Sequence, residues 1–165
     1  MATPEEALIK IINEIIASLV NVDPDLKNIS KVKDAATVAA KGILRVGAGI
    51  LGGTAGSNVM DEVLESSNSI RDLRLELTNL VDEIRTSSNQ RVDKIVIFVD
   101  DLDRIDPPEA VKILELLKNI FSIPGCVFVL AIYYQVVIKG LKEKFGERTP
   151  ENEWEFRAFI DKILQ

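Results

Sequence analysis

Three aspartates and an arginine directly follow a run of five apolar residues in the second half of the chain. The apolar run is Ile95–Val99, and the charged side chains are Asp100, Asp101, Asp103 and Arg104. A strand that leaves a sheet commonly ends in polar residues, so a solvated turn would explain the acids alone. Neighbouring carboxylates can also hold Mg²⁺ and act on a water molecule beside a nucleotide. The pattern therefore has two interpretations, a strand terminus and a metal–nucleotide site.

The overall composition limits the chemistry that any such site could perform. The 165 residues include no histidine, which excludes histidine-based triads, histidine-ligated zinc and histidine general bases. Cys126 is the only cysteine, so no internal disulfide can form and a reducing, cytoplasmic setting is expected. The net charge of −6 argues against a broad basic surface, and we expect no nucleic-acid partner. Chemistry must then depend on carboxylates, lysine, arginine and the backbone.

No targeting or membrane-spanning segment is predicted. The N-terminal MATPEEALIK carries acids where a secretory signal needs basic residues. Residues 46–60 are uncharged, but this stretch is shorter than the roughly 20 apolar residues of a span, and it contains Ser57, Asn58 and several glycines. We therefore expect no transmembrane helix.

The first half of the chain has the apolar spacing of helices. A capping box at Thr3 opens the first predicted helix, which ends at Asp23. A second helix begins at Ser30 and fades near Gly47, and a third, with a continuous apolar stripe, begins at Ser69. Residues 1–93 are therefore predicted to be a helical region without strands or internal repeats.

The apolar period changes at residue 94. Ile95–Val99 has the pattern of a strand that is covered on both faces of a parallel sheet. Asp106 and Pro107 open a helix, and residues 127–132 form a second buried strand. The fold class is thus α/β, a helix-rich half followed by a right-handed βαβ unit over residues 94–165. Ligands of such units bind beyond the carboxyl ends of the strands.

An apolar strand that ends in two acids has the form of a Walker B motif. In that motif the first carboxylate holds Mg²⁺, usually through a water, and the second orients or deprotonates the attacking water. We accordingly expect Asp100 to be the metal ligand and Asp101 to be the catalytic residue.

The stretch VIFVDDLDRIDPPEAVKILELLKNIF, followed by CVFVLAI and FIDKILQ, resembles the KAP family of P-loop NTPases. The resemblance is specific over residues 94–165 and loose over the helical half. It implies hydrolysis of ATP with Mg²⁺ in the full-length protein, in a family often tied to membrane-associated assemblies and, in bacteria, to phage defence. It also assigns Asp103 and Arg104 to the nucleotide-binding signature. Arg104 either reaches a phosphate or, as we favour, pairs locally with Asp103 or Asp106.

Two features depart from the pattern of that family. No segment matches G-x-x-x-x-G-K-[ST], whose amides and lysine hold the phosphates. Tyr133 follows the second strand where the family tends to place an acid, and a phenol is not a base at neutral pH. We therefore predict that residues 1–165 are one partial KAP-type domain with an incomplete sheet, inactive by itself. The alternative is a non-catalytic interaction or scaffold domain with the same fold.

The open edges of a two-stranded sheet lead to a prediction about partners. Unpaired strand edges tend to pair with another chain, so we expect self-association or protein partners, or a helix from the first half covering an edge.

A G-x-G-x-x-G segment at residues 47–52, with Asp72 some distance beyond, suggests dinucleotide binding as a third hypothesis. That fingerprint requires a preceding strand and a following helix, and neither is predicted here. A loop or close helix packing through small residues explains the glycines better.

Overall fold

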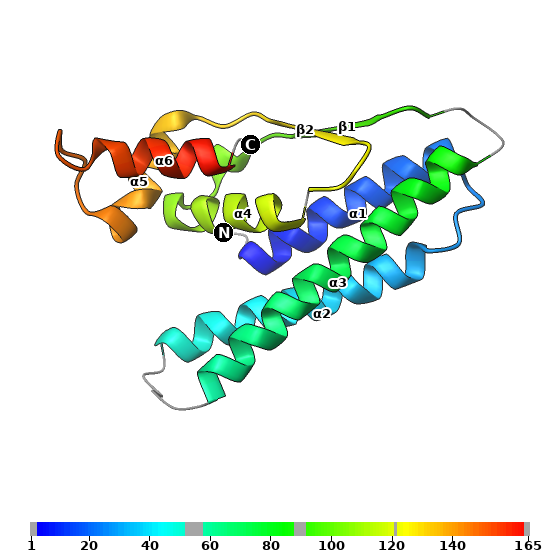
Figure 1. The fold of residues 1–165 in the computed structure, drawn as a ribbon, viewed down its shortest axis with the longest axis horizontal. Coiled ribbons are helices and arrows are strands. Elements are labelled where there is room, and N and C mark those ends of the chain that lie inside the picture. Colours follow the sequence, from blue (N-terminus) through cyan, green and yellow to red (C-terminus); the bar gives the residue numbers. More distant parts are fainter. Residues whose placement is uncertain (1–2, 52–57, 88–91, 121, 164–165) are drawn as a thin grey trace.

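The computed structural model describes residues 3–51, 58–87, 92–120 and 122–163 (Figure 1). The elements, in chain order, are α1 (Pro4–Val22), α2 (Ile29–Leu51), α3 (Asn58–Thr86), β1 (Ile95–Val99), the 3₁₀ turn η1 (Leu102–Arg104), α4 (Pro107–Ile120), β2 (Cys126–Leu130), α5 (Tyr134–Phe145) and α6 (Glu153–Ile163). Most described residues are helical, and the described strands form a small parallel sheet, consistent with the predicted α/β class.

The start of α1 confirms the predicted capping box. The Thr3 hydroxyl accepts a hydrogen bond from the Glu6 amide at 3.3 Å, and the Glu6 carboxylate accepts one from the Thr3 amide at 3.1 Å. The helix ends where predicted, because the Asp23 amide donates to the carbonyl of Leu19 and Asp23 itself is extended. Local sequence chemistry thus decides both ends of this element.

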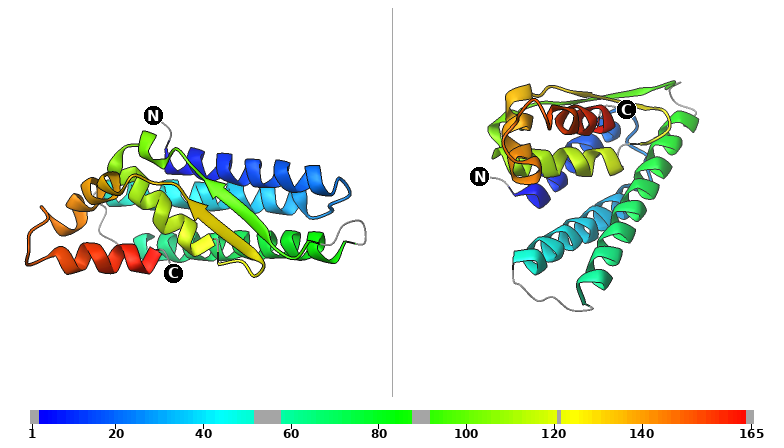
Figure 2. Two further views of the ribbon diagram at one scale, coloured as in Figure 1. Left: turned by 90° about the horizontal axis from the view of Figure 1, so that it is seen from above. Right: turned by 60° about the vertical axis from the view of Figure 1, so that its left-hand side comes forward.

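Helices α2 and α3 lie side by side as a long hairpin that projects away from the sheet (Figures 1 and 2). Both helices are longer than predicted: α2 continues through Gly47 to Leu51, and α3 begins at Asn58, well before Ser69. Glycine weakens an isolated helix by only about 1 kcal/mol, and contact between two long helices outweighs that cost. The carboxylate of Glu83 on α3 also accepts the amides of Lys27 and Asn28, at 2.7 and 3.3 Å, which ties the α1–α2 connection to the hairpin.

The βαβ unit is confirmed. Strands β1 and β2 pair in parallel, with Ile95 opposite Cys126 and Val99 opposite Leu130, and α4 connects them. Helix α4 begins at Pro107 as predicted, while β2 lies one residue earlier at its start and two residues earlier at its end than expected. The parallel pairing places both carboxyl ends at the same edge of the sheet.

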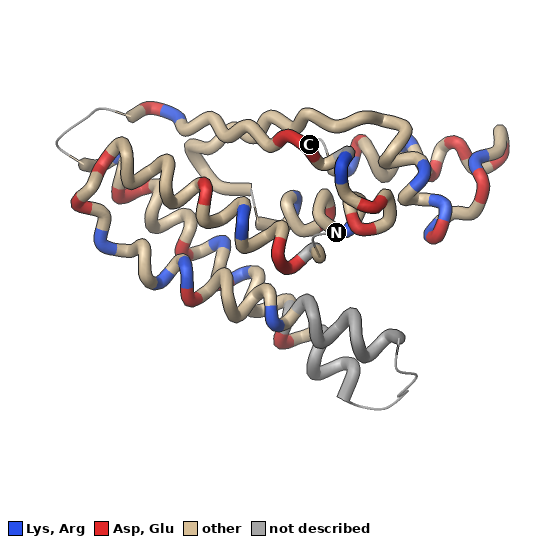
Figure 3. Tube along the Cα trace, turned by 180° about the vertical axis from the view of Figure 1, so that it is seen from behind, with Lys and Arg blue, Asp and Glu red and all other residues tan. Residues whose placement is uncertain are grey.

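The prediction that both faces of the sheet are covered is wrong for the described residues. The described helices leave one face of the sheet uncovered: α4 lies beneath the sheet, α1 lies along the β1 side, and the α2–α3 hairpin is farther away (Figures 1 and 2). On the other face Val96 and Phe98 are 51% and 75% exposed, and Val127 and Val129 are also exposed. An unbroken apolar run indicates that both faces of a strand are apolar. It does not indicate whether helices of the same chain pack on both faces. Figure 3 shows that β1 and β2 carry no charged residues along their length.

No helix among the described residues combines the length and apolar character needed to cross a membrane. The uncharged stretch considered in the sequence, residues 46–60, lies partly outside the described residues.

Helix α5 approaches the start of α4 so closely that only glycine fits between them. A Cβ atom built on Gly140 would lie 2.1 Å from the carbonyl oxygen of Pro107 and 2.7 Å from a methyl carbon of Val111. Gly140 and Val111 are both buried, and the nearest obstacle is backbone, which a side-chain rotation cannot relieve. The glycine therefore sets how near α5 can come to the βαβ unit.

We predict that Gly140→Ala lowers the free energy of unfolding by about 1–3 kcal/mol, because the added methyl must displace the first turn of α4. Urea denaturation followed by circular dichroism measures the change. The matched control is Lys139→Ala, at the exposed neighbouring position of α5, which should stay within about 0.5 kcal/mol of the parent. Equal stabilities for the two variants would contradict the close approach.

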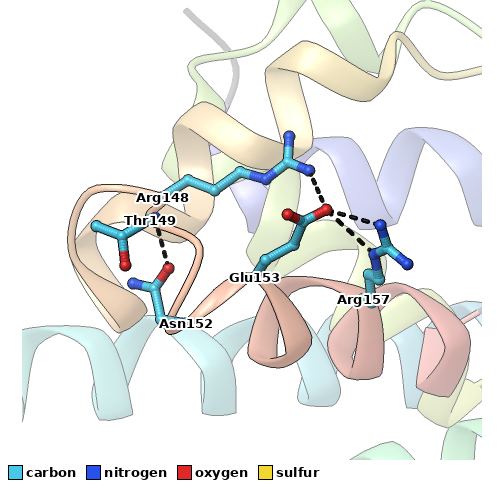
Figure 4. Close-up of polar contacts among 5 residues, drawn as sticks. All are labelled: Arg148, Thr149, Asn152, Glu153 and Arg157. Atoms are coloured by element: carbon cyan, nitrogen blue, oxygen red, sulfur yellow. Dashed lines mark hydrogen bonds and ion pairs between the residues drawn. The ribbon is translucent and has the colours of Figure 1, made fainter.

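The turn between α5 and α6 is held by a polar cluster that the sequence did not reveal (Figure 4). The Asn152 amide group donates to the carbonyls of Phe145 and Glu147 at 3.0 and 2.9 Å and accepts the Thr149 amide at 2.7 Å. One oxygen of Glu153 accepts hydrogen bonds from two arginines, Arg157 and Arg148, at 2.8 and 2.7 Å. These contacts, with Arg157 contributing most, lower the pKa of Glu153.

The direction of that shift predicts a pH dependence. A depressed carboxyl pKa stabilises the fold above the pKa of the unfolded chain, and this stabilisation is lost as the pH falls through the lower folded value. Glu153→Gln should therefore lower Tm at neutral pH, and the difference from the parent should disappear under acidic conditions. Thermal melts across the carboxyl titration range, with Glu143→Gln on the exposed face of α5 as the control, measure it. A difference in Tm that is the same at every pH would contradict the assignment.

Candidate functional site

The predicted site residues lie at the carboxyl end of β1. Asp100 and Asp101 follow the strand directly, both are exposed, and the 3₁₀ turn η1 begins with the next residue. Val99 and Leu102 are buried on either side of the two acids, at 6% and 2% exposure. The apolar neighbours anchor the turn in the core, and the two carboxylates are thereby left at the surface.

The backbone of Asp101 is in the left-handed region, with φ 64° and ψ 16°. Among the described residues it is the one non-glycine residue with a positive φ. Aspartate tolerates this conformation better than most residues, but it still costs on the order of 1 kcal/mol. The Asp101 amide donates to Oδ1 of Asp100 at 2.7 Å, so the first carboxylate helps to hold the second residue in place.

Arg104 pairs with Asp101. Its Nε lies 2.9 Å from Oδ1 of Asp101, and its backbone amide donates to the Asp101 carbonyl at 3.2 Å. The pairing is local, as the sequence analysis favoured, but this partner was not among the acids considered there. In a 3₁₀ turn, residues three apart lie above one another, which brings Arg104 over Asp101. The side chain of Asp103 lies outside the described residues.

The acids open into a groove between β1 and α1. The groove has a volume of about 800 Å³, and Asp100, Asp101 and Arg104 line one end of it. Helix α1 contributes the charged residues Glu6, Lys10 and Glu14, together with apolar side chains. The site is therefore a concave surface with charges of both signs, and a helix from the first half flanks the free edge of β1 across this groove.

Tyr133 lies at the other strand end, as the sequence predicted. It precedes the first residue of α5, is 64% exposed, and its carbonyl accepts the amide of Val136 at 2.9 Å. The amide of Ala131 donates to the carbonyl of Val99 at 2.9 Å, which fixes the end of β2 beside the end of β1. The structure therefore brings the Tyr133 segment and the two aspartates to one edge of the sheet.

The donor set suits Mg²⁺ better than a metal held by protein alone. In the part of the chain that the structure describes, no three Asp, Glu, Cys or His side chains come close enough to enclose an ion. Mg²⁺ is commonly held by one or two carboxylates, with waters and substrate phosphates completing the octahedron. Asp100 offers such a carboxylate, whose Oδ1 already accepts the Asp101 amide.

The glycine-rich segment lacks the context of a dinucleotide site. Gly47 and Gly49 lie inside α2, and the element before them is α1, so no described strand leads into them. The last glycine of the segment, Gly52, lies outside the described residues. The helical context supports the packing explanation.

Comparison with known proteins connects the whole chain to one family. The family model described as the KAP family P-loop domain matches residues 3–165, which covers both the helical half and the βαβ unit. No curated protein and no solved structure matches the chain.

Proposed function

Because the chain belongs to the KAP family of P-loop NTPase domains, we propose that it forms the metal and water side of an ATP hydrolysis site. The observation that carries this proposal is the placement of Asp100 and Asp101 together, at the carboxyl end of a parallel strand and at the mouth of a groove. An exposed pair of acids that merely ends a strand has no need of such a groove. Residues 1–93 and 94–165 would then be the helical and Walker B portions of one partial domain.

Each residue of the site has a proposed role. Asp100 would hold Mg²⁺, directly or through a water molecule, and Asp101 would orient or deprotonate the water that attacks the γ-phosphate. Bound Mg²⁺ would neutralise charge on the phosphate oxygens. We assign Asp103 and Arg104 to the same nucleotide-facing turn, since both belong to η1.

These 165 residues supply only part of what phosphoryl transfer requires. The sequence contains no G-x-x-x-x-G-K-[ST], so these residues do not supply the amide cradle and the lysine that hold the phosphates in such a motif. Without the amide cradle and the lysine, the negative charge of the triphosphate would lie beside negatively charged aspartates, with no P-loop lysine to offset the repulsion. We therefore propose that the isolated chain is inactive and binds Mg²⁺-ATP weakly.

Mutation of the two acids tests the proposal. Calorimetric titration and phosphate-release assays on the 165-residue chain should show weak binding at most and no turnover. In a form that also carries the phosphate-binding loop, Asp101→Asn should abolish turnover while largely sparing binding. Asp100→Ala should weaken Mg²⁺-dependent binding itself. Asp161→Asn, an exposed acid on α6, controls for the loss of one charge. Tight binding or turnover by the 165 residues alone would show that the phosphate site lies elsewhere.

Tyr133 favours a second candidate, a scaffold domain that keeps the fold without hydrolysis. An exposed phenol at the end of β2 can donate a hydrogen bond but cannot act as a base at neutral pH. The same assay separates the two functions, because a scaffold would show no hydrolysis even when the phosphate-binding loop is present.

We also propose that the chain associates with a second copy through the uncovered face of the sheet. Four apolar side chains, Val96, Phe98, Val127 and Val129, are exposed there, and both strand edges lack a further strand in the described chain. Exposed apolar surface and unpaired edges both favour pairing with another chain. The single free cysteine suits a reducing, cytoplasmic setting for this assembly.

Phe98→Ser should weaken self-association roughly tenfold, because it removes the most exposed aromatic ring of that face. Sedimentation equilibrium gives the dissociation constant of each variant. Leu75→Ser is the matched control, since Leu75 is a large exposed apolar residue on α3, away from the sheet. A parent chain that stays monomeric at all concentrations would refute the proposal.

A further inference from the structure

Arg104 makes two contacts with the same residue, Asp101. Its backbone amide donates to the Asp101 carbonyl at 3.2 Å, and its Nε lies 2.9 Å from Oδ1 of the Asp101 carboxylate. Together these contacts close the 3₁₀ turn on both the backbone and the side-chain side. A residue held at both its carbonyl and its carboxylate has less freedom than one held at either alone.

Asp101 needs such restraint because its backbone conformation is unfavourable. A positive φ at a non-glycine residue persists only where the surroundings determine it. At Asp101 these surroundings are the Asp100 carboxylate on the amide, Arg104 on the carbonyl and carboxylate, and the buried Leu102 that follows. Arg104 is the member of this set that contacts the functional group itself.

The ion pair has little value as a stabilising contact. The Arg104 and Asp101 side chains are 77% and 57% exposed, and ion pairs between exposed side chains add little to stability. The pair does engage one particular carboxylate oxygen of Asp101, Oδ1. Because Oδ1 is engaged by Arg104, we assign Oδ2 to the water molecule.

We infer that Arg104 is a positioning residue that holds the Asp101 backbone in the left-handed conformation and directs Oδ2 of its carboxylate toward the attacking water. This inference rests on the proposed function and refines it, since Arg104 then acts through Asp101 rather than as a phosphate ligand. A phosphate ligand would strengthen substrate binding, and its loss would raise KM. A positioning residue improves alignment in the chemical step, and its loss lowers kcat.

The first test uses the 165-residue chain and needs no activity. Backbone scalar couplings and the ¹³Cα chemical shift of Asp101, measured by NMR, report its φ angle. Arg104→Ala should move both away from left-handed values, and Arg104→Lys should restore them in part. The matched control is Lys112→Ala, which removes another exposed pair of the same spacing, Lys112 with Glu109 at 2.8 Å, from α4. Unchanged Asp101 signals in Arg104→Ala would overturn the inference.

The second test is kinetic and uses the form that carries the phosphate-binding loop. Arg104→Ala should lower kcat roughly tenfold to a hundredfold with KM for Mg²⁺-ATP little changed, and Arg104→Lys should recover part of kcat. A raised KM with unchanged kcat would make Arg104 a phosphate ligand and overturn the inference.

The two tests separate failure of this inference from failure of the proposed function. If Asp101→Asn is inactive but Arg104→Ala is fully active, the inference fails and the proposed function stands. If the parent itself does not hydrolyse ATP, the proposed function fails, and the role of Arg104 in water activation fails with it. The NMR result then decides only whether Arg104 holds the Asp101 turn.

Discussion

Parallel pairing of β1 with β2 is the constraint on which the rest of the structure depends. The amide of Ile95 donates to the carbonyl of Gly125 at one end of the pair, and the amide of Ala131 donates to the carbonyl of Val99 at the other, both at 2.9 Å. Parallel strands require a crossover, which α4 provides beneath the sheet. This arrangement sends the Asp100 and Tyr133 segments out at the same edge of the sheet.

The helical half supports this unit from one side only. Helix α1 flanks β1 across the groove that the acids enter, while α2 and α3 form a hairpin that extends away from the sheet (Figures 1 and 2). The other face of the sheet stays apolar and exposed. The same chain thus combines a well-packed interior with a surface suited to further contacts, and the groove arises because α1 flanks the β1 edge without pairing with it.

The turn after β1 links this architecture to chemistry. Burial of Val99 and Leu102 fixes where the chain leaves and re-enters the core, and the two aspartates must lie between those anchors. Between those anchors Asp101 adopts a left-handed conformation, and the 3₁₀ turn brings its carboxylate beside Arg104. The left-handed conformation is energetically unfavourable, and it occurs at a residue to which we assign a function. Such backbone strain is common at functional sites.

Some features could be predicted from residue types and spacing alone. The capping box at Thr3, the helix start at Pro107, the two apolar strands and the position of the paired acids follow from local preferences, which act over a few residues. The resemblance carried by DDLDR agrees with the family match.

Contacts between distant segments decided the rest. Helix α3 starts early, at Asn58, and it packs against α2. The uncovered face of the sheet depends on where all the helices lie. The Arg104–Asp101 pair depends on a backbone angle that no local pattern specifies. Local propensity acts within one turn of chain, whereas burial and backbone strain are properties of the packed whole, and for that reason only the tertiary structure could decide them.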